Sequence, residues 1–468
     1  MIQEGIKILE DNKVFIQGIN ILEKDTESPV ERVQAMLKRY MELDNVSFLF
    51  GTGSSIILGA KSIQNIPLEI EEKIKEEKDT YDEFISIIKI LQNIEKGQRE
   101  ERNKVDDEEK EIKYPLEKLL NFLIAVDFLQ EYSKEIIGYK KIKNLINIIK
   151  KELFHLCDIE KQNIKIELLN DEEKNHLLRN RYYYHECFTK KLLQRSLNLR
   201  RANIFTTNYD LAFDNAFDKL GVQYINGFSG FHRRFFKPET FEYDIFFPGS
   251  TTQGKVHRIE KVLKYFKIHG SLSWINREPS ENCVYGIEEV PIDILRENNN
   301  FENLMIYPTT SKKTYTLDYP YSELLRQFSN SIVTPQSVLI TFGYSFCDEH
   351  INDLIYQALT IPSFTLIIID FMGTEGSEEI KRLKELNDPR VIIIQGKQFG
   401  SFPFFVKNLM PDLIEIDNNV KIAETLQKIL GEEKKEQKEG NTNDITNDLT
   451  ANNNKIEEQK EENDDMPF

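Results

Sequence analysis

The 468-residue sequence contains few cysteines: there are four, at positions 157, 187, 283 and 347. They are too far apart for a CxxC zinc ribbon or an evident disulfide framework, so we expect a reducing compartment and no structural zinc. Long apolar runs are also missing. No stretch of about 18 apolar residues occurs, and residues 1–12 lack the apolar core of a signal peptide. We therefore expect neither export nor membrane insertion, and we predict a cytoplasmic protein.

Positive charge is scarce relative to negative charge, and the formal net charge is −17. This excess argues against direct nucleic-acid binding by the chain as a whole. Much of the excess lies from Gly431 onward, where 12 acidic and 5 basic residues occur. That composition cannot bury enough apolar surface to fold. We predict an N-terminal extension over 1–27, a folded domain over 28–430 and a disordered acidic tail over 431–468.

Glycine and proline are almost absent between residues 66 and 199, where long amphipathic stretches predict a large helical insertion. Within it, the charged segment 95–113 is most simply a solvated loop or a frayed helix end. The three histidines of this region, His155, His176 and His185, have spacings that suit no metal site. We expect them to be surface residues or hydrogen-bonded core residues.

Four apolar runs each stop in a cluster of small polar residues, which is typical of parallel strands whose carboxyl ends form a ligand crevice. The runs and the segments that follow them are Val46–Phe50 before Gly51, Gly53 and Ser54; 203–206 before Thr207, Asn208 and Asp210; 265–268 before His269; and Val338–Phe342 before Gly343 and Ser345. A further buried run, 364–369, ends at Asp370, and 391–394 supplies a last strand. Helices are predicted over 30–43, 81–94, 116–132, 142–153, 211–220, 321–332 and 351–359. The pattern predicts an α/β fold with a Rossmann-like, mostly parallel sheet flanked by helices.

Some segments allow two interpretations. Residues 1–24 could form a short strand pair or a helix, and residues 228–264 could form an irregular lid or small strands. His269 could be a structural strand-end residue, yet glycine and serine follow it and leave its ring accessible for proton transfer. Arg233 and Arg234 could attract a phosphate or simply lie on the surface. Asp348 and His350 suggest a metal pair, but helix capping explains them better because no third ligand accompanies them.

The four strand-end motifs, in this order, make the chain resemble the sirtuin superfamily, and particularly the bacterial sirtuin-like proteins that destroy NAD during antiphage defence. Gly51-Thr52-Gly53-Ser54-Ser55 is similar to the GAGxS loop along the NAD phosphates, although it lacks a full GxGxxG and a P-loop lysine. Thr207, Asn208 and Asp210 match the TxNxD segment at the nicotinamide ribose, and His269-Gly270 matches the catalytic His-Gly pair. Gly343 and Ser345 are similar to the later GxS motif on the adenosine side, where Asp370 would meet the ribose.

The resemblance implies hydrolysis of NAD to nicotinamide and ADP-ribose, with NAD as the substrate and without a metal. In the mechanism that the resemblance implies, Asn208 orients the attacking water and the ribose, and His269 is the general base. Because unrestrained NAD hydrolysis would kill the host, and because the helical insertion offers extra apolar surface, we expect a homo-oligomer that is held inactive until activated. Similar sirtuin-like proteins work with a HerA-type hexameric ATPase, or with an Argonaute-like or other sensor, and we expect a HerA-type partner. Two departures, the missing zinc ribbon and the helical insertion, count against an NAD-dependent protein deacylase. That activity and a non-catalytic NAD or ADP-ribose sensor are the alternatives.

Overall fold

The computed structural model describes most of the chain up to Ile414. The described residues are 12–22, 28–61, 66–76, 78–101, 116–132, 142–165, 167, 169–247, 258–299, 301, 303–306 and 319–414. Met1–Leu413 forms one compact unit, and Ile414 is the one described residue of the second. The predicted acidic tail therefore lies outside the described residues.

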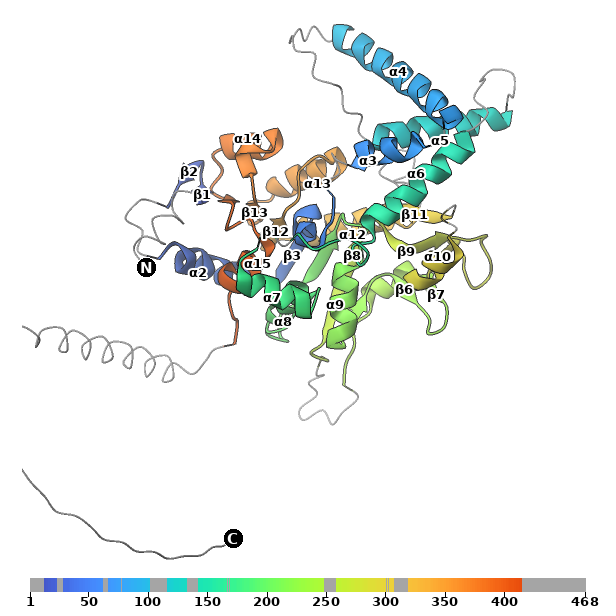
Figure 1. The fold of residues 1–468 in the computed structure, drawn as a ribbon. Helices are drawn as coiled ribbons and strands as arrows, with labels where there is room; N and C mark the ends of the chain where they lie inside the picture. The colour runs from blue at the N-terminus through green and yellow to red at the C-terminus, as the bar shows by residue number, and fades with distance from the viewer. Residues whose placement is uncertain are drawn as a thin grey trace, which may run out of the picture. The chain divides into compact units, whose positions relative to one another are not determined.

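A nine-stranded sheet forms the centre of the first unit (Figure 1). Its strands, in spatial order, are β2 (Ile19–Asn20), β1 (Asn12–Ile16), β14 (Val391–Gly396), β13 (Thr365–Asp370), β12 (Ser337–Phe342), β3 (Asn45–Phe50), β4 (Asn203–Thr206), β8 (Val262–Lys267) and β5 (Gln223–Ile225). The seven strands from β14 to β5 are parallel, whereas β1 and β2 form an antiparallel pair at one edge. The predicted mostly parallel α/β sheet is thus confirmed. In the described part of the N-terminal segment, residues 12–22, the strand-pair alternative is found.

The strand order reverses between β3 and β12. From β3 the chain adds β4 and β8 on one side, and then returns to place β12 on the other side of β3, followed by β13 and β14. Ligands of open α/β sheets bind beyond the carboxyl ends of the strands at such a switch point. The loops that follow Phe50 and Phe342 start there.

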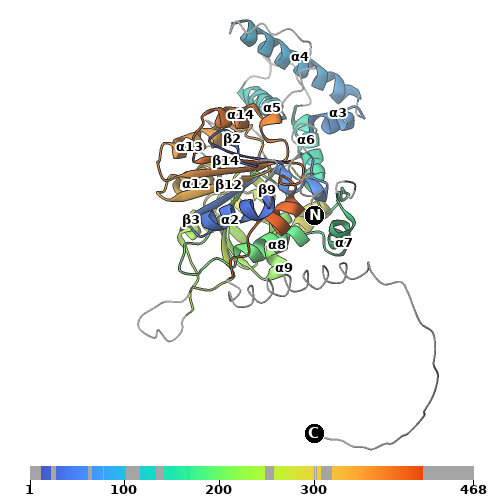
Figure 2. The same ribbon diagram turned by 90° about the vertical axis from the view of Figure 1, so that its left-hand side faces the viewer.

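Helices cover both faces of this sheet (Figures 1 and 2). One face packs against α2 (Pro29–Met41), α8 (Tyr183–Leu192), α9 (Ala212–Leu220), α15 (Phe402–Phe404) and the π-helical turn η7 (Phe405–Leu409). The other face packs against α12 (Tyr321–Ile332), α13 (Glu349–Leu359) and α14 (Glu378–Glu385). Alternate strand residues serve the two faces: Phe48 and Phe50 of β3 join the first core, and Leu49 joins the second. Burial on both faces explains why these strands are almost wholly apolar.

The region between β3 and β4 is mainly helical, as the sequence predicts. It contains the short 3-10 turns η1 (Thr52–Ser54) and η2 (Ile56–Leu58), and the helices α3 (Ile66–Ile74), α4 (Lys78–Glu101), α5 (Leu116–Tyr132), α6 (Ile142–Cys157), α7 (Asp171–Arg179) and α8. Helices α3 to α6 share a third apolar core. Helix α4 continues to Glu101, so part of the charged segment 95–113 is helical, and residues 102–115 lie outside the described ranges. Among the helices that the structure describes, none is long and apolar enough to span a bilayer.

A second, antiparallel sheet of five strands lies beyond β8. Its spatial order is β11 (Leu304–Ile306), β9 (Gly270–Asn276), β10 (Ile287–Glu289), β7 (Arg234–Phe236) and β6 (Phe228–Ser229), and α10 (Ile292–Asn298) follows β10. The segment 228–264 therefore contains small strands rather than only an irregular lid. Trp274 of β9 is buried and packs against Phe228, with ring centroids 4.9 Å apart. Ile268 and His269 form the connection from the first sheet to the second.

Candidate functional site at the sheet switch point

The loops after β3 and β12 touch each other through glycines. A Cβ added to Gly343 would lie 2.4 Å from the Gly53 Cα, and one added to Gly51 would lie 2.4 Å from the Gly343 carbonyl oxygen. The Gly53 amide donates to that same carbonyl at 3.1 Å. The predicted glycines are thus brought together, and in the structure their lack of a side chain allows one loop to pack on the other.

Asn208 connects the end of β4 to the loop after β3. Its side-chain Nδ2 donates to the Gly51 carbonyl at 3.0 Å and to the hydroxyls of Ser54 and Ser55 at 3.2 and 3.4 Å. Its backbone amide donates to the Thr206 hydroxyl at 3.0 Å. Within the described residues, no hydrogen bond is made by its Oδ1. The amide is therefore oriented through its nitrogen, and its oxygen can accept from a ligand.

Two predicted residues of this group are more buried than the sequence indicates. Ser54 is fully buried, and its hydroxyl donates to the Gly51 carbonyl at 2.9 Å. Asp210 is buried and accepts from the Ala212 amide at 3.0 Å, near the start of α9. Burial raises the pKa of the Asp210 carboxyl, while the nearby Lys267 ammonium opposes that rise. Thr207 is half-buried, and its amide donates to the Phe50 carbonyl at 3.0 Å.

Lys267 at the end of β8 is a buried cation that sequence reasoning did not single out. Its Nζ lies 3.2 Å from Asp214 Oδ2 and also contacts the Asp210 carbonyl oxygen. The Tyr265 hydroxyl donates to the same Asp214 oxygen at 3.1 Å. A lysine that ends a strand directly after the aromatic residues Tyr265 and Phe266 is the signal that could have indicated this network. The hydrogen bonds and the ion pair of this network hold the segment after β4 against β8.

His269 follows β8 closely, and β8 pairs in parallel with β4, with Lys267 opposite Thr206. Asn208 and His269 therefore leave neighbouring strands at the same edge of the sheet. Tyr209, which follows Asn208 in the chain, has its ring centroid 6.4 Å from that of His269. The two predicted catalytic residues come from adjacent strand ends, as the four-strand pattern required.

His269 has a partner that the sequence did not reveal. Its Nε2 lies 2.8 Å from Oδ2 of Asp348, and only 17% of the His269 side chain and 8% of the Asp348 side chain are exposed. Asp348 is also the N-cap of α13, because its side chain accepts from the His350 and Ile351 amides. The predicted helix-capping role of Asp348 is thus confirmed. The pairing with His269 could not be read from the capping motif.

The predicted adenosine-side residues follow β12 and β13. Ser345 is exposed, and its carbonyl accepts from the Ser377 hydroxyl at 3.1 Å. Asp370 ends β13, and its Oδ1 accepts from the Met372 and Gly373 amides at 2.9 and 2.6 Å. Burial raises the pKa of the Asp370 carboxyl, and these amides partly offset the rise. The Gly343 amide donates to the Ile369 carbonyl at 2.9 Å, so these two strand ends adjoin.

Three further residues that the sequence analysis considered, Arg233, Arg234 and His185, lie outside this group of strand ends. Arg233 pairs with Glu288 at 2.9 Å and Arg234 pairs with Glu289 at 2.5 Å, so carboxylates of β10 already neutralise both. His185 is wholly buried, and neither ring nitrogen has a hydrogen-bond partner in the described part of the chain. It is therefore a core residue, but not the hydrogen-bonded one that we expected.

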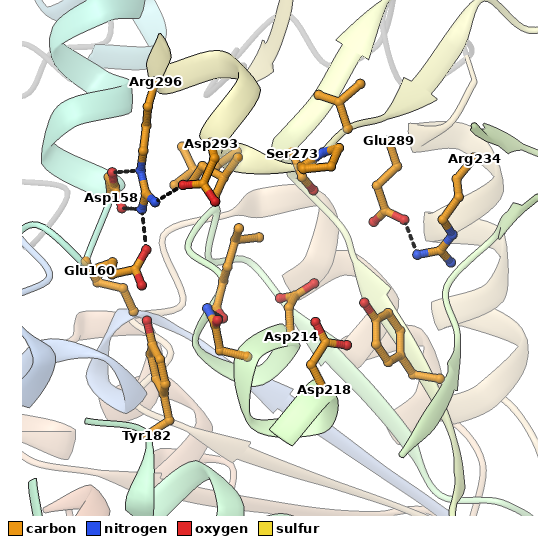
Figure 3. A pocket seen from close by; sticks show the side chains of 18 of the residues that line it. Asp158, Glu160, Tyr182, Asp214, Asp218, Arg234, Ser273, Glu289, Asp293 and Arg296 are labelled. Atoms are coloured by element: carbon orange, nitrogen blue, oxygen red, sulfur yellow. Dashed lines mark hydrogen bonds and ion pairs between the residues drawn. The ribbon is translucent and has the colours of Figure 1, made fainter. Parts of the chain in front are cut away.

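A separate cavity of about 410 Å³ lies beside α9 and is lined by none of the predicted site residues (Figure 3). Its charged walls are Asp158, Glu160, Asp214, Asp218, Glu289, Asp293, Arg234 and Arg296. Arg296 is paired with three of these carboxylates, at 2.5 to 2.7 Å. The remaining negative charge would repel a pyrophosphate. The strand ends are therefore the better place for a dinucleotide.

Comparison with known protein families finds one match. Residues 202–387 match the family model of the SIR2-like domain. The matched range includes β4, β8, β12 and β13, and so contains Asn208, His269, Gly343 and Asp370. This part of the chain is thus similar to SIR2-like domains, and the similarity supports an NAD-related function. A search of curated proteins finds no match. No group of three or more potential metal ligands occurs among the residues that the structure describes.

Proposed function

We propose that the protein hydrolyses NAD at the bond between nicotinamide and ribose. The observation that carries the proposal is the placement of Asn208 and His269 on adjacent parallel strand ends, beside the switch point of the sheet, within the range that matches the SIR2-like domain. NAD is the substrate in this reaction. The match supports NAD as the small molecule, and the chemistry of the two side chains supports hydrolysis.

The reaction breaks the bond between C1′ of the ribose and the nicotinamide nitrogen, and passes through an oxocarbenium-like state. Water attacks C1′ and loses a proton, which gives ADP-ribose and free nicotinamide. Asn208 Oδ1 would accept from the ribose or the attacking water, because Nδ2 is occupied by the loop after β3. His269 would accept the proton of the water, directly or through a ribose hydroxyl.

Residues outside this pair would bind the rest of the dinucleotide. The loop from Gly51 to Ser54 lies at the switch point, where the pyrophosphate of a dinucleotide is expected. Because the Ser54 hydroxyl is buried, backbone groups of this loop are better suited to the phosphates than that hydroxyl. Asp370 Oδ2 would accept an adenosine-ribose hydroxyl, since Oδ1 already accepts two turn amides.

The test is nicotinamide release by the parent and by the variants His269→Ala and Asn208→Ala. Loss of one positioned acid–base group typically costs about 10²–10⁴ in rate. We expect both variants to stay folded and to bind NAD within about an order of magnitude of the parent, while release nearly stops. Near-parental turnover in both variants would contradict the hydrolase proposal. Release that needs an acylated peptide would support the deacylase instead, and no release by the parent under activating conditions would support the sensor.

We extend the proposal to the cell, where unrestrained NAD hydrolysis would kill the host. Such an activity suits an antiphage effector of the abortive-infection type, kept inactive in a homo-oligomer or by a partner such as a HerA-type ATPase. The same variants test this extension. Activation of the parent should deplete cellular NAD, and activation of the His269→Ala variant should leave NAD unchanged. Equal depletion by both would contradict it.

A further inference from the structure

The carboxylate beside His269 is fixed by the fold. Asp348 Oδ2 lies 2.8 Å from His269 Nε2, while its Oδ1 accepts from the His350 amide at 3.0 Å and the Ile351 amide at 3.4 Å. These amides begin α13, whose positive end favours a negative charge at this position. The carboxylate cannot rotate without losing the helix cap.

The backbone of His269 is fixed as well. The preceding amide, of Ile268, donates to the Thr206 carbonyl at 2.9 Å. The following residue, Gly270, has φ +99°, and a Cβ added there would lie 2.4 Å from the Met305 carbonyl oxygen. The ring is thus held between two anchored backbone positions and one anchored carboxylate. It has little freedom to choose another partner.

This geometry determines which ring nitrogen carries the proton. A carboxylate only accepts hydrogen bonds, so His269 Nε2 is the donor. In the neutral imidazole, the other nitrogen, Nδ1, then holds the lone pair. We propose that Asp348 is a positioning residue, which holds His269 with Nδ1 as the base. This inference rests on the proposed NAD hydrolysis. The proton of the attacking water passes to Nδ1, and the resulting imidazolium faces the Asp348 carboxylate.

The first test is Asp348→Asn. Asparagine is a good N-cap, so α13 keeps its cap and the variant should fold. Its amide can present N–H groups to Nε2, which favours the opposite tautomer, and such a replacement beside a catalytic histidine lowers kcat by about 10⁴. We expect nicotinamide release to fall about 10²- to 10⁴-fold, with NAD binding within about threefold of the parent. Asp348→Ser also keeps a capping residue but removes the carboxylate, and should show a similar loss of kcat with little change in KM.

The second test reads the tautomer without NAD. In protein labelled with ¹⁵N-histidine, the His269 signals are assigned by their loss in His269→Gln. We expect the neutral parent to carry its proton on Nε2 and the Asp348→Asn variant to carry it on Nδ1. A proton on Nδ1 in the parent would overturn the proposal, even if the protein hydrolyses NAD.

The matched control is Glu349→Gln, which removes one negative charge from the exposed first turn of the same helix. It should keep parental turnover and the parental tautomer. Parental turnover per folded molecule in Asp348→Asn would overturn the positioning role. If the parent releases no nicotinamide under activating conditions, the proposed function fails together with the catalytic use of the pair. The ¹⁵N spectrum distinguishes that outcome from an incorrect assignment of the hydrogen bond between His269 and Asp348.

Discussion

Alanine at Gly343 should destabilise the protein through two separate effects. Gly343 has φ +56°, in the left-handed region that costs a residue with a Cβ about 1–2 kcal/mol. The added Cβ would also lie 2.4 Å from the Gly53 Cα and 2.9 Å from the Gly53 nitrogen. These are backbone atoms of the facing loop, and they cannot move aside by changing a rotamer. Overpacking of this kind costs about 1–3 kcal/mol.

The expected loss for Gly343→Ala is therefore about 2–5 kcal/mol, the combined range of the two effects. Gly221 offers a matched control, because its φ is +63° but no atom lies within 4 Å of an added Cβ. Gly221→Ala should lose only the conformational part, about 1–2 kcal/mol. The difference between the two variants isolates the contact between the loops after β3 and β12.

Equilibrium urea denaturation of the parent and both variants measures these losses. Nicotinamide release, measured well below the unfolding transition, then tests the site: Gly343→Ala should lose activity because it separates the two loops, and Gly221→Ala should keep it. Equal destabilisation by the two substitutions would refute the reasoning. It would mean that the loop after β12 moves away from Gly53 without cost.

Two further predictions concern buried titratable groups. Lys267→Met should lower the free energy of unfolding, measured by urea denaturation, by about 3–5 kcal/mol, because Asp214 is left as an unpaired buried charge. Adding Asp214→Asn should recover part of that loss. No recovery would exclude Asp214 as the partner of Lys267. Burial lowers the pKa of His185 from 6.5 to about 3. Between these two pH values the unfolded protein binds a proton at His185 and the folded protein does not. The parent therefore loses stability as the pH falls from 6.5 towards 3. His185→Phe removes this effect, and its stability relative to the parent should rise by about 1.4 kcal/mol per pH unit below the ordinary histidine pKa of about 6.5; a difference independent of pH would contradict it.

The parallel strands were predictable because burial on both faces leaves a plain sequence signal. The predicted run Val338–Phe342 is β12 to within one residue, and α12 has the predicted bounds Tyr321–Ile332. Short, wholly apolar runs between amphipathic helices allow few other folds.

The second sheet was not predictable in the same way. Strand β6 has two residues, and β7 and β10 have three each. Strands this short carry too few positions for a period of two to emerge. Their pairing also joins segments far apart in the chain, such as β7 with β10. Such pairing depends on tertiary packing, here around the buried Trp274, rather than on local preference.

In the candidate site, the positions of the strand ends could be predicted from the sequence, whereas the directions of individual side chains could not. The four-strand pattern correctly predicted that the loops after β3 and β12 adjoin, as the contact between Gly53 and Gly343 confirms. It could not predict that the η1 turn directs Ser54 inward, where its hydroxyl bonds the Gly51 carbonyl. A serine in a polar loop has the same sequence signal whether its hydroxyl faces a ligand or the backbone. The individual binding roles therefore stay predictions.

The pairing of Asp348 with His269 could not be predicted because another role already explained an aspartate at this position. Asp348 precedes a helix and accepts from its first amides, so capping accounts fully for an aspartate at that position. The second use of the same carboxylate depends on the turn between the two sheets, 79 residues earlier in the chain. Because one oxygen serves the helix and the other serves the histidine, substitution by alanine would remove both functions together. Asparagine and serine preserve the cap, so they can separate a contribution to folding from a contribution to proton transfer.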